Sequence, residues 1–255
     1  MTKLYITKFG QGPNLVLLHG WGSSSKVWQS CISTLSQHYR VWCVDLPGHG
    51  DSHNIKWDAE FDQGVELLAA SIPQPCSIIA WSLGGLFAQL YTNYFTEHVS
   101  RLMLLASTPK FIADDHWPHG MQQTTFNSFQ QQYKLAPQET LLKFSNLQVL
   151  HTKQRKQTLK ILKSALSNQY KHTNNIAWGL DWLSKLDFFD SEKLKTNHIQ
   201  MLHGELDQVV SIDAAKQTST LWENSKLLQI SDAGHAAFIS HENDFINLVH
   251  NWMES

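Results

Sequence analysis

The chain has 255 residues, and its hydrophobic content of 42% is enough to build a sizeable core within one large domain. Its formal net charge of −2 gives no reason to expect a nucleic-acid or membrane partner. The N-terminus lacks the apolar run of a signal peptide, and no apolar stretch approaches the length of a membrane span, so we expect a cytoplasmic protein. The three cysteines, Cys31, Cys43 and Cys76, form no CxxC motif, and we interpret them as reduced core residues; a cysteine nucleophile is the lesser alternative.

The first part of the chain alternates apolar runs with helical patterns. The apolar runs predict strands at residues 4–8, 15–18, 41–44, 77–80 and 102–106. The segments between them predict a helix that Ser23, Ser24 or Ser25 can cap and that continues through Leu35, and another from about Asp58 to residue 70. Strands that alternate with helices indicate an α/β fold with a doubly wound, mostly parallel sheet.

One of these strands leads into a sharp turn with a serine at its apex. Residues 80–85 read Ala-Trp-Ser-Leu-Gly-Gly, and a helical run follows. Strand, serine turn and helix are the parts of a nucleophile elbow, in which the strained turn exposes the serine hydroxyl. The usual pattern is G-x-S-x-G, so Ala80 replaces the first glycine with one extra methyl group, which we expect to be tolerated. An ordinary turn could have a similar sequence, so the assignment of a nucleophile elbow depends on finding the other residues that the reaction needs.

The alternation stops near residue 109. Residues 110–185 predict helices without a convincing strand, and they carry ten Lys and Arg against four Asp and Glu, a net charge of +6. We interpret this stretch as a helical lid inserted after the sixth strand of a core formed by residues 1–109 and 186–255. A run of helices that only covers the core is the alternative. Lys153, Lys156, Lys160 and Lys163 recur at helical spacing, which predicts an amphipathic helix whose basic face is either solvated or docks an acidic partner.

The strand pattern resumes at residues 199–202 and 227–230, with helices at about 214–222 and 242–253. The first of these strands runs into a loop that contains Asp207, and the second runs into a loop that contains His235. Because the carboxyl ends of parallel strands meet at one edge of a sheet, we expect Ser82, Asp207 and His235 to lie close together. Serine, acid and histidine in this chain order are typical of the fold.

Each of these residue types has a chemical role. A serine hydroxyl is a weak nucleophile until a base takes its proton, and His235 can do so near neutral pH. A carboxylate would hold the imidazole ring and stabilise its cation. Asp207 is preferred over Asp232, which is too close in sequence to His235, and over Glu205, which comes early in its loop.

The tetrahedral oxyanion that follows serine attack needs two hydrogen-bond donors. The backbone N–H of Leu83, next after the serine, can supply one, and that of Trp21 in the glycine-rich loop at residues 19–22 can supply the other. No cluster has metal-ligand spacing, so we expect neither a metal nor an organic cofactor. Three further histidines also follow strands, and each could serve a structural hydrogen bond: His19, His49 and His203.

Four motifs narrow the interpretation: His19-Gly20-Trp21-Gly22, Trp81-Ser82-Leu83-Gly84-Gly85-Leu86, Phe129-Gln130-Gln131-Gln132 and His235-Ala236-Ala237-Phe238-Ile239-Ser240-His241. Together they resemble the BioH family of α/β-hydrolases, which are pimeloyl-acyl-carrier-protein methyl ester esterases of biotin synthesis. The resemblance implies a cytoplasmic monomer and a serine carboxylesterase that releases methanol from a pimeloyl methyl ester bound to acyl carrier protein. It implies that Ser82, Asp207 and His235 are the catalytic residues.

The resemblance also implies which residues contact substrate and carrier. The substrate positions fall on Trp21, Ser82, Leu83, Phe144, Ser145, Asn146, Leu147, Gln148 and His235. The basic lid positions that would dock the carrier protein fall on Lys143, Lys156 and Lys160, but a further one falls on Glu139. That departure puts the detailed carrier contact in question, though not the chemistry.

Two other interpretations stay open. A broad short-chain esterase acting on small esters, a thioesterase or a C–C bond hydrolase would use the same three residues, because one fold hosts many chemistries. A hydrolase-like binding protein would use none of them catalytically. The complete set of serine, acid and histidine argues against that second alternative, and a covalent serine probe would separate the two.

Overall fold

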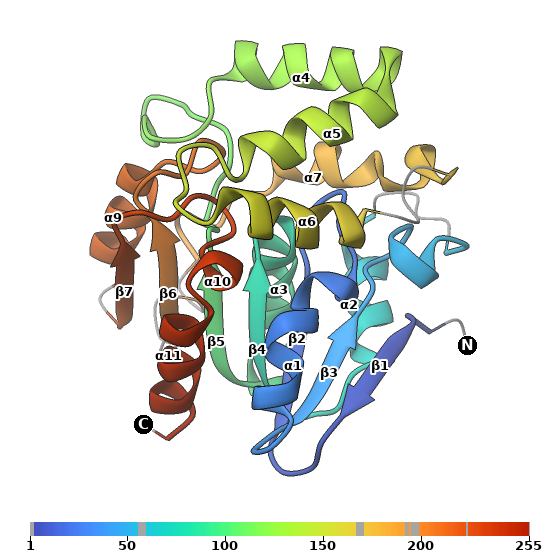
Figure 1. The fold of residues 1–255 in the computed structure, drawn as a ribbon, viewed down its shortest axis with the longest axis vertical. Helices are drawn as coiled ribbons and strands as arrows, with labels where there is room; N and C mark the ends of the chain where they lie inside the picture. Colours follow the sequence, from blue (N-terminus) through green and yellow to red (C-terminus); the bar gives the residue numbers. More distant parts are fainter. Residues whose placement is uncertain are drawn as a thin grey trace.

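The computed structural model describes residues 3–55, 60–166, 171–191, 194, 199–222 and 224–254. Its centre is a seven-stranded sheet in the order β1-β3-β2-β4-β5-β6-β7 (Figure 1). The strands are β1 (Ile6–Phe9), β2 (Asn14–Leu18), β3 (Arg40–Val44), β4 (Cys76–Trp81), β5 (Val99–Leu105), β6 (Ile199–Gly204) and β7 (Ser225–Ile230). Only the pairing of β1 with β3 is antiparallel. The predicted α/β fold is therefore confirmed, and every predicted apolar run overlaps a strand.

Helices cover both faces of the sheet because the central strands are apolar on both sides. In β2, Leu15 and Leu17 belong to one buried cluster, whereas Val16 and Leu18 belong to the other. The first cluster packs against α1 (Gln29–Leu35), α10 (Ala237–Ser240) and α11 (Glu242–Glu254); the second packs against α2 (Phe61–Ala69), α3 (Leu83–Tyr94) and α9 (Ile212–Leu221). Each fully buried leucine contributes about 1.5–3 kcal/mol, so these two layers hold the strand ends in place.

The segment after β2 differs from the single capped helix that the sequence predicts. It consists of a 3₁₀ turn, Ser25–Trp28, followed by α1, and no serine side chain caps either element. The Ser24 hydroxyl instead donates to the carbonyl of Ala165 at 2.8 Å, and the N–H of Ser25 donates to Asp45 at 2.6 Å. The predicted cap was wrong because these serines join the loop to neighbouring segments. The predicted start of the next helix at Asp58 lies outside the described residues.

Between β5 and β6 the chain forms a helical insert above the carboxyl ends of the strands (Figure 1). Its helices are α4 (Gln123–Leu135), α5 (Pro137–Leu147), α6 (Arg155–Ala165) and α7 (Trp178–Lys185). The insert follows the fifth strand in chain order, so its expected place after a sixth strand was wrong. Its two ends meet where Lys110 pairs with Asp187 at 2.7 Å and the N–H of Phe188 donates to Pro109.

The predicted amphipathic helix exists but is shorter than the lysine pattern suggests. Helix α6 begins at Arg155, so Lys153 lies before it, whereas Lys156, Lys160 and Lys163 are exposed along it. Leu162 is buried on the opposite side of the helix. None of the helices in the described ranges is long and apolar enough to cross a membrane.

Candidate active site

Ser82 occupies the turn between β4 and α3 in a strained backbone conformation. Its φ of 55° and ψ of −120° are rare for any residue except glycine. The N–H of Ser82 donates to Leu105 at 2.9 Å, and the carbonyl of Ser82 accepts from Gly85 at 2.8 Å. Strain of this kind persists only where surrounding contacts fix it, and it concentrates at functional sites.

The small residues beside Ser82 have a steric cause. A Cβ atom on Gly84 would lie 2.5 Å from the carbonyl oxygen of His19, and one on Gly85 would collide with the hydroxyl of Ser107. Helix α3 can approach the sheet this closely only without those side chains. Ala80, by contrast, is fully buried within β4 as part of the core, so the sheet accommodates its methyl group.

The predicted acid and histidine form a buried hydrogen-bonded pair. Nδ1 of His235 donates to Asp207 at 2.8 Å. The other carboxylate oxygen of Asp207 accepts from the N–H groups of Val209 and Val210 at 2.7 and 3.0 Å. Nε2 of His203 lies 3.3 Å from Asp207 and donates to the carbonyl of Val210 at 2.8 Å. The structural hydrogen bond that the sequence suggested for His203 is therefore present, and it helps to fix the loop that carries the acid.

These contacts determine the charge state of Asp207. Burial raises the pKa of its carboxyl, but the charge of His235 and the hydrogen bonds from His203 and His235 outweigh burial and hold that pKa well below its usual range. An ionised Asp207 keeps the proton on Nδ1 of His235. Nε2 of His235 is then the proton acceptor, and it is buried without a hydrogen-bond partner among the described residues.

The two rival acids lie elsewhere. Asp232 contacts His241 at 2.8 Å and Lys153 at 2.9 Å, and Glu205 is exposed. No contact of either carboxylate with the ring of His235 is found in the described part of the chain. The geometry therefore agrees with the choice of Asp207.

The two proposed oxyanion donors flank Ser82. A Cβ atom on Gly20 would lie 3.1 Å from the Cβ of Ser82, so the loop that carries Trp21 passes directly over the serine. Leu83 is the first residue of α3, where a backbone N–H has no partner within the helix. No acceptor for the N–H of Trp21 or Leu83 is present in the described ranges, so both groups are available to an oxyanion.

Two of the remaining histidines, His19 and His49, form hydrogen bonds that hold the loop at residues 19–22 in place. Nε2 of His19 accepts from the N–H of Leu46 at 3.0 Å, and Nε2 of His49 accepts from the N–H of Gly22 at 3.2 Å. Burial lowers the pKa of His19 and is also the largest cause of the lowered pKa of His49. Both rings therefore stay neutral and act as structural hydrogen-bonding groups.

An apolar cavity of about 90 Å³ lies between Ser82 and the helical insert. Its walls are Trp21, Ser82, Phe111, Met121, Thr125, Phe126, Phe129, Phe144, Leu147, Leu180, Leu183 and Val209. The indole ring of Trp21 packs edge-on against Phe129, Tyr133 and Phe144 at centroid distances of 5.0–5.6 Å. Such a lining suits a hydrocarbon chain and a neutral ester rather than a charged group.

The structure separates the predicted substrate positions on α5. Phe144 and Leu147 line the cavity. The side chains of Ser145 and Asn146 instead bond to carbonyls of their own helix, at 2.9 and 2.8 Å. Gln148 reaches the site through its carbonyl oxygen, which accepts from the N–H of His235 at 3.0 Å.

The sequence analysis assigned no role in the site to two groups of residues that the structure places there. Trp81 lies next to the nucleophile, and its indole N–H donates to the carbonyl of His235 at 2.9 Å. Helix α4 contributes Phe126 and Phe129 to the cavity wall, and Tyr133 packs behind them. Their spacing of three and four residues within a glutamine-rich stretch was the available signal, because it marks one apolar face of a helix.

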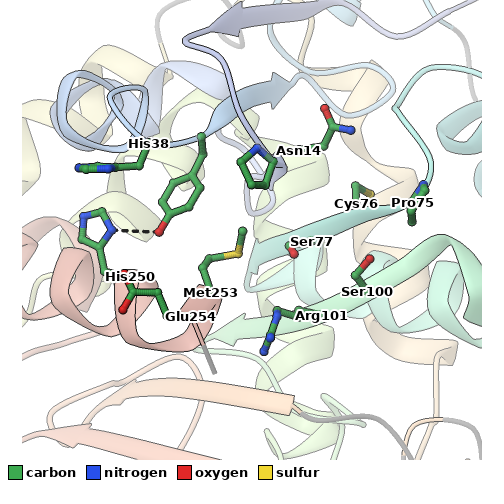
Figure 2. Close-up of a pocket in the computed structure, with 12 residues that line it drawn as sticks. Asn14, His38, Pro75, Cys76, Ser77, Ser100, Arg101, His250, Met253 and Glu254 are labelled. Atoms are coloured by element: carbon green, nitrogen blue, oxygen red, sulfur yellow. Dashed lines mark hydrogen bonds between the residues drawn. The ribbon is translucent and has the colours of Figure 1, made fainter.

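A wider groove of about 860 Å³ lies at the opposite, amino-terminal ends of β2, β4 and β5 (Figure 2). It contains a hydrogen bond of 2.9 Å between the hydroxyl of Tyr39 and His250, and it includes Cys76. Burial raises the pKa of Cys43 and Cys76 to about 12, so both thiols stay protonated, which argues against a cysteine nucleophile. No group of three potential metal ligands occurs within the part of the chain that the structure describes.

Comparison with known proteins extends these observations. Residues 13–242 match the profile of a family described as alpha/beta hydrolase fold. The pimeloyl-[acyl-carrier protein] methyl ester esterase of Aliivibrio fischeri is 36% identical over 247 residues, which are 96% of this chain and 95% of that protein. The esterase of the same name from Serratia marcescens is 35% identical over 251 residues, covering 98% and 97%.

Solved structures agree in fold. An esterase from Exiguobacterium antarcticum superposes with a TM-score of 0.83 at 21% identity, covering 99% of this chain and 96% of that one. A bromoperoxidase from Bacillus anthracis gives 0.84, also at 21% identity, over 99% and 95%. At such identities the likeness shows the fold alone, and the two names illustrate that the fold does not choose the reaction.

Proposed function

This chain belongs to the alpha/beta hydrolase fold family and, within it, to the pimeloyl-acyl-carrier-protein methyl ester esterases, and we propose that it hydrolyses the methyl ester of pimeloyl-acyl-carrier protein in biotin synthesis. The observation that carries the reaction type is the buried pair of Asp207 and His235, 2.8 Å apart, together with the strained Ser82. The carbonyl of His235 accepts a hydrogen bond from Trp81, the residue directly before Ser82. The substrate rests on the relatives, which match this chain over nearly its whole length.

The first half of the proposed reaction forms an acyl-enzyme. Oγ of Ser82 attacks the ester carbonyl carbon while Nε2 of His235 takes the hydroxyl proton. The carbonyl oxygen becomes an oxyanion that accepts hydrogen bonds from the N–H groups of Trp21 and Leu83. The C–O bond to the methoxy group then breaks, and His235 returns its proton to the departing oxygen, which leaves as methanol.

The second half releases the acid. A water molecule gives a proton to Nε2 of His235 and attacks the acyl carbon through its oxygen. The resulting tetrahedral intermediate collapses, the bond to Oγ of Ser82 breaks, and the proton returns to that oxygen. Asp207 stays ionised throughout and stabilises the imidazolium form of His235, which is consistent with the lowered pKa of Asp207.

The cavity supports an acyl substrate with a neutral reacting end. Its lining is apolar apart from Ser82 and Thr125, so the methylene chain of a pimeloyl group can be buried, whereas the carboxylate product would be poorly solvated there. Thr125 is exposed at the surface while it also lines the cavity, which marks a side on which a chain can enter.

Charge on the insert supports a carrier protein as the partner. Lys156 and Lys160 are exposed on α6, and the segment 110–185 carries a net charge of +6. Lys143 is exposed too, but it forms an ion pair of 2.7 Å with Glu139, which offsets its charge. We propose that Lys156 and Lys160 dominate the attraction for an acidic carrier and that Lys143 adds less.

The test compares three substrates under identical conditions. Pimeloyl-acyl-carrier-protein methyl ester should be cleaved with the highest kcat/KM, above free pimelate methyl ester and a short nitrophenyl ester. A preference for the nitrophenyl ester would favour a broad esterase instead, and thioester cleavage that outpaces methyl ester cleavage would favour a thioesterase. Failure of an organophosphonate to label Ser82, together with no turnover of any ester, would indicate a binding protein.

We propose further that the enzyme acts as a cytoplasmic monomer. Its three cysteines are buried and unpaired, as expected of a protein in a reducing compartment. Gel filtration of the purified enzyme tests the monomer: elution near 29.2 kDa is the expected result, and elution at twice that mass contradicts it.

A further inference from the structure

The insert touches the catalytic histidine through its backbone. We call residues 148–153, between α5 and α6, the lid turn, and residues 232–235 the histidine loop. The N–H of His235 donates to the carbonyl of Gln148 at 3.0 Å, and the N–H of Lys153 approaches the carbonyl of Asp232 at 3.4 Å. The lid turn therefore lies along the loop that carries the general base.

The side chain of Asp232 connects the lid turn with the histidine loop. One carboxylate oxygen lies 2.9 Å from Nζ of Lys153 on the lid turn, and the other lies 2.8 Å from Nε2 of His241 at the start of α11. Nδ1 of His241 meets the hydroxyl of Ser240 at 2.9 Å. The hydrogen bond from Lys153 holds the pKa of Asp232 below its usual range. Asp232 thus joins the insert, the histidine loop and the core.

The two segments are in close contact. A Cβ atom on Gly234 would lie 2.7 Å from the carbonyl oxygen of Gln148 and 2.8 Å from the hydroxyl of Thr152. The side chains of Gln148 and Thr152 are at most 6% exposed. Any displacement of the lid turn must therefore move the histidine loop or open a gap beside it.

This contact matters because of how His235 is held. Its Nδ1 is fixed by Asp207 and its carbonyl by Trp81, both from the core, whereas its N–H is held by the insert. Nε2, the atom that must reach Ser82, has no partner among the described residues. Of these three hydrogen bonds, the one to Gln148 comes from the helical insert. The other two come from residues at or just after the ends of strands.

We propose that Asp232 is a positioning residue: through its ion pair with Lys153 and its hydrogen bond with His241, it keeps the lid turn on the histidine loop and so aligns Nε2 of His235 with Ser82. The proposal rests on the proposed function only in that Ser82 and His235 perform ester hydrolysis. It assigns a catalytic consequence to a residue that contacts neither substrate nor the reacting atoms.

The test measures kcat and KM with a short nitrophenyl ester, so that carrier recognition does not enter. Asp232→Asn should lower kcat about 3- to 5-fold with KM within about 2-fold, since exposed ion pairs are individually weak. Lys153→Gln should lower kcat about 2-fold, and Lys153→Arg should keep it. The rate of Ser82 labelling by an organophosphonate should fall in parallel with kcat.

A double variant and a matched control make the test specific. Asp232→Asn combined with Lys153→Gln should be no worse than Asp232→Asn alone, because both changes break the same contact. Lys216→Gln removes another exposed ion pair, 3.5 Å long, which Lys216 forms with Asp213 on α9. That pair includes no residue of the lid turn or the histidine loop, so the variant should leave kcat unchanged.

Two results would overturn the proposal. In the first, Asp232→Asn keeps the kcat of the Lys216→Gln control. In the second, kcat falls but Lys153→Arg behaves like Lys153→Gln, and the loss follows the fall in Tm, which would make the contact merely structural. Neither outcome depends on the carrier substrate, so a failure of the proposed function would be recognised separately.

Discussion

A hollow lies at each end of the parallel strands, but only the carboxyl ends hold the residues that we propose for catalysis. At the carboxyl ends, Ser82 lines a cavity of about 90 Å³, and Asp207 and His235 form their buried pair. At the amino ends, an open groove of about 860 Å³ holds Tyr39 and His250 (Figure 2). None of the twelve residues that line the groove has a positive φ, whereas Ser82 does.

The difference shows that volume is a poor guide to function. The groove is large because helix ends and strand starts leave an open surface, where water screens every charge. The cavity is small because the insert covers it, and covering a polar pair with apolar side chains strengthens its electrostatics. Four tests probe this contrast, from the largest expected effect to the smallest.

The strongest test removes the nucleophile. Ser82→Ala should lower kcat by roughly 10⁴–10⁶, because no serine oxygen remains to attack the ester and the other groups can only assist direct attack by water. The measurement is steady-state hydrolysis of a nitrophenyl ester, with circular dichroism and Tm as folding controls. Organophosphonate labelling should be lost in the variant. Full activity, or labelling of a different serine, would reject the assignment.

The second test asks whether Asp207 or Asp232 is the acid that acts with His235. Asp207→Asn keeps the shape but loses the charge that fixes the ring of His235, so kcat should fall roughly 10⁴-fold. Asp232→Asn should lower kcat only a few-fold by comparison. Parallel kcat measurements on the two purified variants decide the matter, and a reversed order would mean that the acid is Asp232.

The third test leaves the cavity alone and reverses charge on the outer face of the insert. The triple variant Lys143→Glu, Lys156→Glu and Lys160→Glu should lower kcat/KM for the carrier-bound ester by about 10-fold, mostly through KM. Its salt dependence should flatten, because steering by exposed charges is screened over about 10 Å at 0.1 M salt. Hydrolysis of a nitrophenyl ester should hardly change.

A matched control reverses three exposed lysines outside the insert: Lys3→Glu, Lys216→Glu and Lys226→Glu. This control changes the net charge equally, so any loss that it shares with the insert variant is a bulk charge effect. Equal losses of the insert variant on both substrates would indicate structural damage. No loss on either would mean that the lysine face is only solvated.

The smallest effect is expected in the amino-terminal groove. Tyr39→Phe removes the hydroxyl that bonds His250, and His250→Ala removes the ring. Both variants should keep kcat/KM within about 2-fold on nitrophenyl and carrier-bound esters, because the groove lies at the far end of the sheet from Ser82. A loss greater than 10-fold without a matching fall in Tm would mean that the groove takes part in the reaction.

Much of the core could be predicted from the sequence because its signals are local. A buried parallel strand must be apolar on both faces, so runs such as residues 15–18 and 41–44 identified strands directly. The turn at Ser82 could also be recognised, because a serine followed by two glycines at the end of an apolar run is a local pattern. The contacts that require those glycines, with His19 and Ser107, are distant in the sequence. Motifs of this kind also identified the family.

Other features depended on partners far away in the sequence. The serines after β2 looked like a helix cap, but Ser24 bonds to Ala165, which lies 141 residues away. Lys153 fitted the helical spacing of the basic face, but it lies before α6 and forms an ion pair with Asp232. In both cases the neighbouring residues suggested a local role, but the folded chain places the side chain against a distant partner.

By itself, the sequence determined the strands, the elbow and the order of Ser82, Asp207 and His235, because periodicity and turn chemistry act over a few residues. Only the tertiary structure decided how the carboxylate of Asp207 is held against the imidazole of His235, which side chains of α5 reach the cavity, and how the insert contacts His235. Those outcomes depend on hydrogen bonds such as that from His235 to Asp207, 28 residues apart, and from Trp81 to His235, 154 residues apart. Such pairs form only after the sheet has brought its strand ends together, because a hydrogen bond requires its two atoms within about 3 Å.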